Sequence, residues 1–409
     1  MISALKNTLT LVLAGGVGRR LFPLTKERAK PAVVFGGIYR IIDFALSNCI
    51  NSGLRRIHLL TQYRSHSLQR HITLGWNISR ADEFIDTVPP QFRGSDTWYR
   101  GTADAVFHNL FLLDDDKPEY VLVLAGDHVY KMDYGKFLGF HVERGADLSV
   151  ACVQAPRKKA RAYGVVEVDE GDNIVGFLEK PEDPPSVPGN GDFSFVSMGI
   201  YVFSTAELVR AVVRDAKTDT IHDFGHDIIP AMVAEGKKVC AYDFIDENRK
   251  ESAYWRDIGD IDGYFEANMD LCDVDPVFNL YDENWPVHTY LEPDPPSKTV
   301  FADERRKNSR VGKALDSLVS PGVIISGGVI RHSILSPNVR TNSYSDVRNS
   351  ILFHGVDIGR NARIKNVIID KDVIVPEDSI IGYDREKDRK LYTVSPGGVV
   401  VIPKGHLFE

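Results

Sequence analysis

Near the N-terminus the sequence reads TLTLVLAGGVGRRL from Thr8 to Leu21. Its apolar first half is typical of a strand buried on both faces of a parallel sheet. Three glycines follow within four residues, and glycine lets backbone N–H groups converge on phosphate oxygens. The spacing is neither that of a P-loop nor that of the dinucleotide fingerprint, because Leu21 replaces the third glycine of GxGxxG. We therefore expect a phosphate loop of another kind, with Arg20 placed to neutralise phosphate charge.

Outward from this stretch, short apolar runs alternate with helical patterns. Strands are predicted at 57–61, 120–125 and 148–153, and helices at 42–51, 65–74, 103–113 and 134–144. Strands that alternate with helices indicate a parallel sheet covered on both faces, so the fold class is α/β. Ligands of such sheets bind beyond the carboxyl ends of the strands, where the glycine loop lies. After about residue 164 strands follow one another directly, and we place the end of this domain near residue 275.

From about Val319 the pattern changes to short apolar units that recur roughly every six residues. Ile324 and Ile330 begin the series, and Ile374 and Ile380 end it. A hexapeptide period is typical of a parallel β-helix. A set of short antiparallel strands is the alternative. The predicted domains are 1–275, a linker rich in proline and aromatic residues at 276–318, and a β-helix at 319–409.

Composition and charge exclude several classes. The 409 residues carry a net charge of −8, whereas general nucleic-acid binders are basic, and no apolar run is long enough for a membrane span or signal peptide. Ten Lys/Arg and two acids between Arg19 and Arg70 indicate a local anion site. The four cysteines are scattered, which predicts no metal cluster or disulfide framework and a reducing, cytoplasmic location. His222 and His226 are four residues apart, but without a third ligand or an HExxH pattern we expect no metal there.

Three further segments place charged residues where a predicted strand ends or turns. In Val121–His128 an apolar strand delivers Asp127 after a glycine. A carboxylate beside phosphates is the usual ligand of Mg²⁺, although a capping turn is the alternative. Glu179 and Lys180 suit sugar hydroxyls and a sugar phosphate, or form an exposed charge pair. Asp257 could complete the Mg²⁺ shell, or lie in a surface turn.

The glycine loop, followed by Lys30-Pro31-Ala32, resembles the signature of sugar-nucleotide pyrophosphorylases. Nearly the whole chain resembles the glucose-1-phosphate adenylyltransferases, or ADP-glucose pyrophosphorylases, of bacterial glycogen synthesis. The segments that carry this resemblance are Arg28–Ala32, Arg40–Asn48, Trp98–Ala105, Ala125–His128, Phe177–Pro181, Ser197–Tyr201 and Tyr254–Gly259. The resemblance implies a Rossmann-like nucleotidyltransferase domain, a C-terminal left-handed parallel β-helix, a homotetramer and dependence on Mg²⁺. It also implies that ATP and glucose 1-phosphate give ADP-glucose and diphosphate.

The resemblance implies roles for individual residues as well. The expected catalytic residues are Arg20, Lys30, Asp127, Lys180 and Asp257, and the two aspartates are expected to hold Mg²⁺. The expected nucleotide-binding residues are Gly15, Gly16, Gly18, Arg20, Gln62, Gly101, Thr102 and Asp104. The expected ligands of glucose 1-phosphate are Tyr99, Gly164, Glu179, Lys180, Ser194 and Ser197.

Regulation by anionic effectors is expected too, because members of this family are usually switched by small anionic metabolites. Positions that depart from the pattern of the well-studied enteric type are Val17, Glu27, Val34 and Asp115. The remaining candidate effector ligands are Arg28, Arg40 and Arg363. The resemblance therefore predicts an effector site whose preference differs from the enteric one.

Three other functions fit parts of the sequence. A pyrophosphorylase that uses UTP, GTP or dTTP would share the fold and mechanism, and only the resemblance of Trp98–Ala105 favours ATP. A non-catalytic regulatory subunit is disfavoured because the expected catalytic residues are present. An acyltransferase is disfavoured because the final segment has no obvious histidine-centred site for acetyl-CoA.

Overall fold

The computed structural model describes residues 2–78, 82–90, 98–246, 251–302 and 310–408. The chain divides into two compact units, each assembled from three stretches of sequence. The first comprises Met1–Gly16, Phe44–Ser65 and Trp76–Trp255, and the second comprises Val17–Asp43, His66–Gly75 and Arg256–Glu409. These units are defined by packing and are discontinuous in sequence, so they do not test the continuous domains predicted from the sequence. The boundary near residue 275 stays a prediction.

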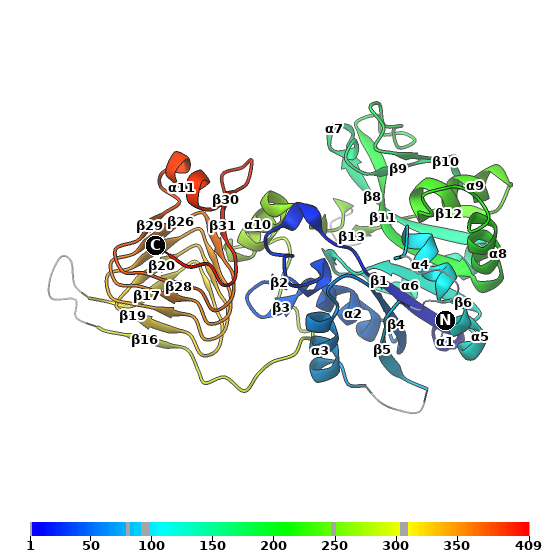
Figure 1. The fold of residues 1–409 in the computed structure, drawn as a ribbon. Coiled ribbons are helices and arrows are strands. Elements are labelled where there is room, and N and C mark those ends of the chain that lie inside the picture. Colours follow the sequence, from blue (N-terminus) through cyan, green and yellow to red (C-terminus); the bar gives the residue numbers. More distant parts are fainter. Residues whose placement is uncertain (1, 79–81, 91–97, 247–250, 303–309, 409) are drawn as a thin grey trace. The chain divides into compact units, whose positions relative to one another are not determined.

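A nine-stranded sheet forms the centre of the first unit (Figure 1). Its parallel part has the order β6 (Tyr120–Ala125), β1 (Thr8–Ala14), β4 (Arg56–Thr61) and β5 (Phe84–Val88). The run that begins at Thr8 is therefore a strand paired on both sides. Leu9 and Leu11 pack with Val121 and Val123 in one core that also includes apolar residues of α4 (Thr102–His108) and α8 (Thr205–Asp215). This confirms the predicted parallel sheet.

Beyond β6 the sheet becomes mixed. Its further strands are β8 (Leu148–Pro156), β9 (Gly164–Val168), β10 (Ile174–Glu179), β11 (Phe193–Ser204) and β12 (Val239–Asp243). β11 runs antiparallel to β6, β8 and β9, and β10 runs antiparallel to β9. Only β12 restores a parallel pair, with β8. The change from parallel to antiparallel pairing agrees with the loss of intervening helices in the sequence.

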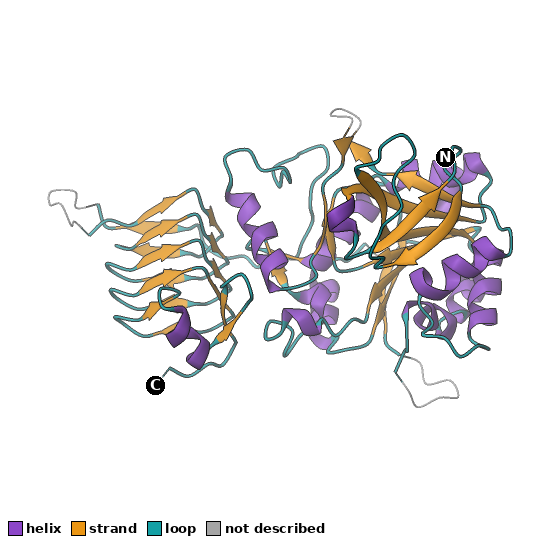
Figure 2. Cartoon of the chain, turned by 90° about the horizontal axis from the view of Figure 1, so that it is seen from above, coloured by secondary structure: helices purple, strands orange, loops and turns teal. Residues whose placement is uncertain are grey.

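Helices lie on both faces of the sheet (Figure 2). α6 (Tyr134–Arg144) contacts β8, β11 and β12. It begins at Asp133, whose side chain accepts the Gly135 N–H, and ends at the left-handed Gly145. The helix predicted at 103–113 is instead two helices, α4 and α5 (Phe111–Asp116), separated at Asn109. The other helices that include residues of this unit are α1 (Ile2–Lys6), α2 (Ile41–Asn51), α7 (Arg157–Ala160), the π-helix η3 (Phe224–Ile228) and α9 (Ile229–Ala234).

The second unit contains a parallel β-helix, drawn in yellow to red in Figure 1. One of its three sheets consists of β16 (Lys298–Val300), β19 (Ile324–Ser326), β22 (Arg340–Thr341), β25 (Asp357–Ile358) and β28 (Ile374–Val375). The next consists of β17 (Lys313–Leu315), β20 (Val329–Arg331), β23 (Asp346–Arg348), β26 (Arg363–Lys365) and β29 (Ile380–Ile381). The last consists of β18 (Leu318–Val319), β21 (Ile334–Leu335), β24 (Ile351–Leu352), β27 (Val367–Ile369), β31 (Val400–Ile402) and β30 (Thr393–Val394).

Each later coil of this β-helix takes 17 residues, since Arg340 pairs with Asp357 and Asp357 with Ile374. Three hexapeptides would need one residue more, which explains why the six-residue pattern slips in the sequence. The coils that begin at β19, β22 and β25 each turn at three corners where a residue has a positive φ, and one series of such corners is Asp316, His332, Asn349 and Asn366. Asparagine, aspartate and glycine tolerate this conformation best. The first coil begins at Lys298, inside the stretch 276–318 that the sequence suggests as a linker.

Short elements complete the fold. They are η1 (Arg19–Leu21), η2 (Lys30–Ala32), β2 (Val34–Phe35), β3 (Tyr39–Arg40), α3 (His66–Gly75), β7 (His128–Tyr130), β13 (Ile245–Asp246), β14 (Glu251–Ser252), β15 (Trp255–Asp257), α10 (Ile261–Met269), η4 (Asp270–Cys272) and α11 (Arg385–Leu391). None of the helices in the described ranges combines the length and apolar character that crossing a membrane requires.

Candidate active site

The glycine loop packs closely against other predicted site residues. Within the first unit, a Cβ on Gly15 would stand 3.0 Å from the Cβ of Gln62. Within the second unit, Gly18 has φ +64°, and a Cβ there would stand 2.8 Å from the Cβ of Lys30. A β-carbon is strained at positive φ, so Gly18 is required both by its conformation and by its neighbour. Gly16 is exposed and has open space around it.

Arg20, Lys30 and Asp257 lie together in the second unit. Lys30 Nζ lies 3.2 Å from Asp257 Oδ1, and the lysine side chain is buried. The guanidinium nitrogens of Arg20 lie 3.4 and 3.5 Å from the point where a Cβ on Gly259 would stand, and Asp257 Oδ2 lies 3.5 Å from that point. Two cations beside one carboxylate leave a positive balance, which suits a polyphosphate. The structure thus brings together three residues that are separated by up to 237 positions in the sequence.

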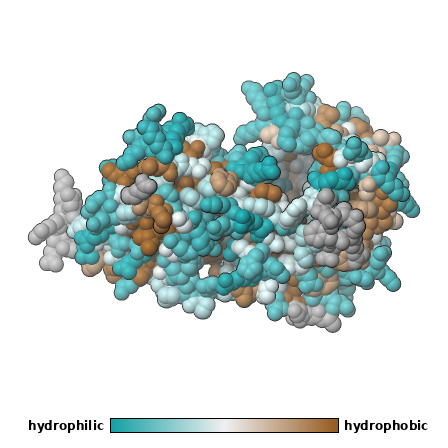
Figure 3. Space-filling view, in the orientation of Figure 1, coloured by the Kyte–Doolittle hydropathy of each residue, from teal (hydrophilic) through white to brown (hydrophobic). Residues whose placement is uncertain are grey.

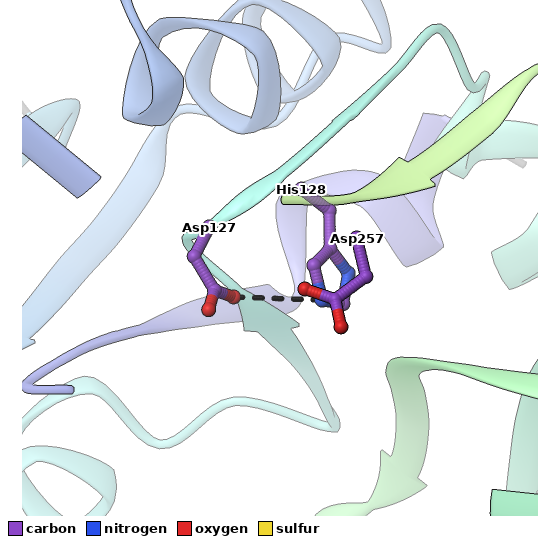
Figure 4. Close-up of side chains that lie close together, drawn as sticks. All are labelled: Asp127, His128 and Asp257. Atoms are coloured by element: carbon purple, nitrogen blue, oxygen red, sulfur yellow. Dashed lines mark ion pairs between the residues drawn. The ribbon is translucent and has the colours of Figure 1, made fainter. Parts of the chain in front are cut away.

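Asp127 follows β6 in the first unit and is half-buried. Figure 4 shows its carboxylate facing His128, whose Nε2 lies 3.5 Å from Asp127 Oδ1. The indole N–H of Trp255 donates to His128 Nδ1 at 3.4 Å. Nδ1 is then an acceptor, so the proton of the neutral ring lies on Nε2, toward Asp127. Sequence reasoning missed this contact of His128, because its partner Trp255 lies 127 positions away in the chain.

Asp257, also labelled in Figure 4, belongs to the second unit and ends β15. Asp127 and Asp257 offer carboxylate oxygens, and both side chains retain some solvent exposure, with relative values of 28% and 23%. Carboxylate oxygens are the protein ligands that Mg²⁺ prefers, usually one or two of them together with substrate phosphates. The donor chemistry of the two aspartates therefore fits the ion that the family resemblance implies.

The predicted nucleotide turn lies where α4 begins. A Cβ on Gly101 would clash with the carbonyl oxygens of Ile221 and His222. Thr102 Oγ1 donates to Asp223 Oδ2 at 2.9 Å. Asp104 is buried, and its Oδ2 accepts the Arg100 N–H at 2.8 Å. The Asp104 carboxylate is therefore turned inward and shapes the turn, and its contact with a nucleotide stays a prediction.

The predicted sugar-phosphate residues Gly164 and Glu179 face one another across β9 and β10. A Cβ on Gly164 would stand 2.6 Å from the Phe177 ring and 3.1 Å from Glu179 Oε2. Lys180 follows with φ +47°, and its Nζ lies 2.7 Å from Glu179 Oε1. Both charged groups remain accessible to solvent. The strand end thus presents one cation and one carboxylate side by side.

The other predicted sugar-phosphate residues differ in accessibility. Tyr99 is half-buried, and its hydroxyl accepts from Asn109 Nδ2 at 3.0 Å. Ser194 and Ser197 are three positions apart on β11, so their side chains point to opposite faces of the sheet. Ser194 is fully buried with its hydroxyl away from solvent, whereas Ser197 is half-buried and accepts the Gly199 N–H at 3.3 Å. Strand alternation therefore turns Ser194 inward, and its contact with a ligand stays a prediction.

Two of the three expected effector arginines are otherwise engaged. Arg28 is buried in an ion pair in which its Nη2 lies 2.9 and 3.1 Å from the two carboxylate oxygens of Asp370. The Arg363 guanidinium lies 4.6 Å from the centroid of the Tyr383 ring. Buried pairing neutralises Arg28, and Arg363 points outward from β26. Neither lines the cavity that contains Arg40, so a role of either residue in effector binding stays a prediction.

Arg40 lines a cavity of about 100 Å³ in the second unit, together with His71, His354 and Lys371. Glu292 and Asp294 lie in its wall. Burial lowers the pKa of Arg40 to about 10, and the nearby cations Arg28 and Arg70 act in the same direction against Asp43. Burial, Arg40 and Arg28 lower the pKa of Lys371 to about 8. Sequence reasoning missed Lys371, because it lies 331 positions from Arg40 and no motif contains it.

Two family models match this chain. Residues 9–274 match the family model "Nucleotidyl transferase", and residues 295–402 match "GlmU-like, C-terminal hexapeptide". The second match, with the three parallel sheets, assigns the C-terminal fold as a left-handed parallel β-helix.

Curated relatives match over the full length. A "Glucose-1-phosphate adenylyltransferase" of Koribacter versatilis is 50% identical, covering 98% of this chain and 97% of the relative. One of Rhodopirellula baltica is 50% identical, covering 98% and 91%. A "Glucose-1-phosphate adenylyltransferase 2" of Vibrio cholerae is 47% identical, covering 99% and 100%. The chain therefore belongs to the nucleotidyl transferases and, among them, to the glucose-1-phosphate adenylyltransferase family.

Proposed function

We propose that this protein transfers the adenylyl group of ATP to glucose 1-phosphate, giving ADP-glucose and diphosphate. The observation that carries the proposal is the meeting of Arg20, Lys30 and Asp257 beside the glycine loop, in a chain whose relatives bear this activity in their names. Arg20 and Lys30 supply positive charge where a triphosphate would lie. Glu179 and Lys180 supply the acceptor and the cation that a sugar phosphate needs.

The reaction needs no nucleophile from the protein. A phosphate oxygen of glucose 1-phosphate forms a bond to the α-phosphorus of ATP, and the bond from that phosphorus to the bridging oxygen breaks. Diphosphate leaves with the electron pair of that bond. The attacking oxygen is already ionised, so no strong general base is required. Lys180 would orient the attacking phosphate, while Arg20 and Lys30 would neutralise the charge that develops on diphosphate.

A divalent cation is part of this proposal, and we assign it to Asp127 and Asp257. When bound, Mg²⁺ would neutralise phosphate oxygens and make the α-phosphorus more electrophilic. The protein's contribution is to hold the two carboxylates. His128, fixed by the Trp255 N–H, turns its Nε2 toward Asp127 and restricts that side chain. Tyr99, Ser197 and the backbone of Gly101 and Thr102 complete the proposed substrate contacts.

The experiment that tests the function measures diphosphate release with Mg²⁺ and glucose 1-phosphate, across ATP, UTP, GTP and dTTP. We expect release with ATP far above the others. Asp127→Asn should lower kcat at least about 1,000-fold while the protein stays folded, because it removes a charged ligand without changing volume. Its matched control is Asp133→Asn, which alters the cap of α6 outside the site.

Preference for another nucleotide would change the substrate and keep the mechanism. If the wild type releases no diphosphate with any nucleotide, even when inorganic phosphate and sugar phosphates are added as activators, that result would contradict the enzymatic proposal and favour a regulatory subunit. Near-normal turnover by Asp127→Asn would show that Asp127 is not a ligand of the metal.

We also propose that the Arg40 cavity binds a small anionic effector. Burial lowers the pKa of both Arg40 and Lys371, and neighbouring cations act in the same direction. A phosphate group would supply negative charge beside these cations. Arg40 belongs to the same stretch, Val17–Asp43, that carries Arg20 and Lys30, which offers a short covalent route between the cavity and the proposed diphosphate site.

Assembly into a homotetramer and a cytoplasmic location complete the proposal. Exposed apolar side chains of the C-terminal part, namely Ile374, Ile380, Leu391 and Leu407, would be covered in an oligomer. Brown patches over the β-helix in Figure 3 lie on an otherwise mainly hydrophilic face. The four cysteines are buried and unpaired, as a reducing compartment would leave them.

A further inference from the structure

His222 is a fully buried side chain that the proposed reaction does not use. Its Nδ1 lies 2.6 Å from Asp215 Oδ2 and 3.0 Å from Thr220 Oγ1. Thr220 Oγ1 also donates to the other oxygen of Asp215, at 2.8 Å. An ionised carboxylate only accepts hydrogen bonds, so Nδ1 carries the proton of this contact. We call the contacts of His222 with Asp215 and Thr220 the clamp. Asp215 is the last residue of α8, so the clamp connects His222 to a helix of the core.

The backbone of His222 has φ +58°, which is unfavourable for a residue with a β-carbon. Such a conformation persists only where its surroundings enforce it. The buried side chain and its two polar partners supply that restraint. The restraint fixes the direction of the His222 carbonyl group.

That carbonyl group holds the predicted nucleotide turn. His222 O accepts the N–H of Ala103 at 2.8 Å and that of Asp104 at 3.4 Å, in the first turn of α4. These are N–H groups that a helix cannot satisfy internally. Gly101 approaches the same backbone so closely that a β-carbon would clash with it. The turn therefore follows the position of His222.

The next residue adds a second connection. Asp223 Oδ2 accepts from Thr102 Oγ1 at 2.9 Å, and Thr102 Oγ1 accepts the Phe224 N–H at 3.0 Å. A Cβ on Gly225 would stand 3.1 Å from the Phe177 ring, which also packs against Gly164. The segment 222–225 thus contacts both the nucleotide turn and the strands proposed to bind glucose 1-phosphate.

We propose that His222, clamped by Asp215, is a positioning residue for the nucleotide turn. It acts through its main-chain carbonyl group and does not touch substrate. Assignment of the turn to ATP rests on the proposed function, whereas the clamp itself does not. His226 differs from His222, because its side chain is exposed and its Nδ1 lies 2.8 Å from Oδ1 of its neighbour Asp227.

The test uses His222→Gly and Asp215→Asn in the full-length protein. Glycine keeps the left-handed backbone possible, so this variant removes the clamp and adds no strain. We expect each variant to raise the KM for ATP about tenfold, the effect of losing one buried hydrogen bond. The KM for glucose 1-phosphate should change less than about twofold. Exchange of the amides in a peptide covering residues 99–108 should become faster.

His226→Gly is the matched control, because it changes a histidine of the same segment whose side chain is exposed. It should leave both KM values and the amide exchange unchanged. Gly101→Ala should also raise the KM for ATP. The φ of −154° at this position suits alanine, so the only new strain is the clash of its β-carbon with the carbonyl oxygens of Ile221 and His222.

Unchanged ATP KM and unchanged exchange in the clamp variants would overturn the proposal. Equal increases in both KM values, together with a lower Tm, would overturn it too, because they would indicate general loosening. If the wild type does not use ATP, the proposed function fails, and the exchange experiment still decides whether the clamp holds the turn.

Discussion

Gly18 has a backbone conformation that costs glycine little, and it packs against Lys30. Its φ of +64° and the 2.8 Å to the Lys30 Cβ are two separate reasons for glycine. Gly145 offers a comparison, since its φ is +54° and a β-carbon there would meet nothing within 4 Å. The two positions share the conformational requirement and differ in the steric one.

We predict that Gly18→Ala and Gly145→Ala each lower the free energy of unfolding by about 1–2 kcal/mol, the strain of a left-handed residue with a β-carbon. Only Gly18→Ala should also lower kcat/KM, by about 100-fold, because Lys30 is displaced from the diphosphate. Denaturant unfolding and steady-state kinetics measure the two effects. Equal activity of both variants would mean that the Lys30 position is not set by Gly18.

The sequence predicted which residues belong to the motifs better than it predicted which way their side chains point. The glycine loop, Lys30 and Lys180 were recognisable because each stands in a local motif. The inward turn of Asp104 and of Ser194 was not, since it depends on a cap and on the register of β11. The pairing of Arg28 with Asp370 joins positions 342 residues apart, which no local pattern encodes.

Among the elements, α6 carries a buried titratable group. His141 lies on α6 with Nδ1 3.0 Å from Ser149 Oγ and Nε2 3.5 Å from Ser204 Oγ, so it packs against β8 and β11. Burial lowers its pKa to about 4, against the weaker opposite effect of Asp147. The folded state therefore resists protonation of this histidine, while the unfolded chain accepts a proton near pH 6.5.

The sign of the effect follows from proton uptake. Between about pH 6.5 and pH 4 the unfolded state binds more protons at His141, so stability falls as the pH falls through this range. We predict that His141→Gln flattens this part of the profile. Between pH 7 and pH 4, the free energy of unfolding should fall by roughly 3 kcal/mol less in the variant than in the wild type. Urea unfolding across this range measures it. Parallel profiles of wild type and variant would show that His141 does not carry the acid sensitivity.

Elements were predictable where one periodicity dominated. β1 and β6 are mainly apolar because both of their faces are buried. The break between α4 and α5 was missed, since the Asn109 side chain donates to Ala105 O at 2.8 Å and a local bond of that kind leaves the apolar pattern unchanged. The β-helix was recognisable from its isoleucines, but its 17-residue coil was not, because each later coil is one residue shorter than three hexapeptides.

At the scale of the whole molecule, the second unit joins the N-terminal signature to the β-helix. Arg28 follows the glycine loop, and its partner Asp370 lies directly after β27. Lys371, the next residue, lines the Arg40 cavity. One buried ion pair therefore ties the stretch with Arg20 and Lys30 to the coil that contributes Lys371. Removal of one partner would leave a buried charge, which is strongly destabilising.

This arrangement gives the proposed effector site a distinctive pH dependence. The pKa of Lys371 is lowered from 10.5 to about 8 by burial, Arg40 and Arg28, against Asp370 and Asp372. A bound anion would stabilise the charged form and raise that pKa again, so binding requires protonated Lys371. The other titratable groups in the cavity wall are His71, Tyr290, His354, Glu292 and Asp294, and the Arg40 charge persists because its pKa stays near 10.

We predict that inorganic sulfate binds the Arg40 cavity and that its affinity falls as the pH rises through about 8, over a range in which sulfate keeps its charge. Lys371→Gln should weaken binding about tenfold at pH 7 and abolish the dependence above it, because it removes the titrating charge. Lys365→Gln is the control, since that lysine is exposed on β26 and does not line the cavity. Calorimetric titration measures the affinities. A pH dependence that persists in Lys371→Gln would assign the titration to another group, and equal weakening by Lys365→Gln would mean that sulfate responds only to general surface charge.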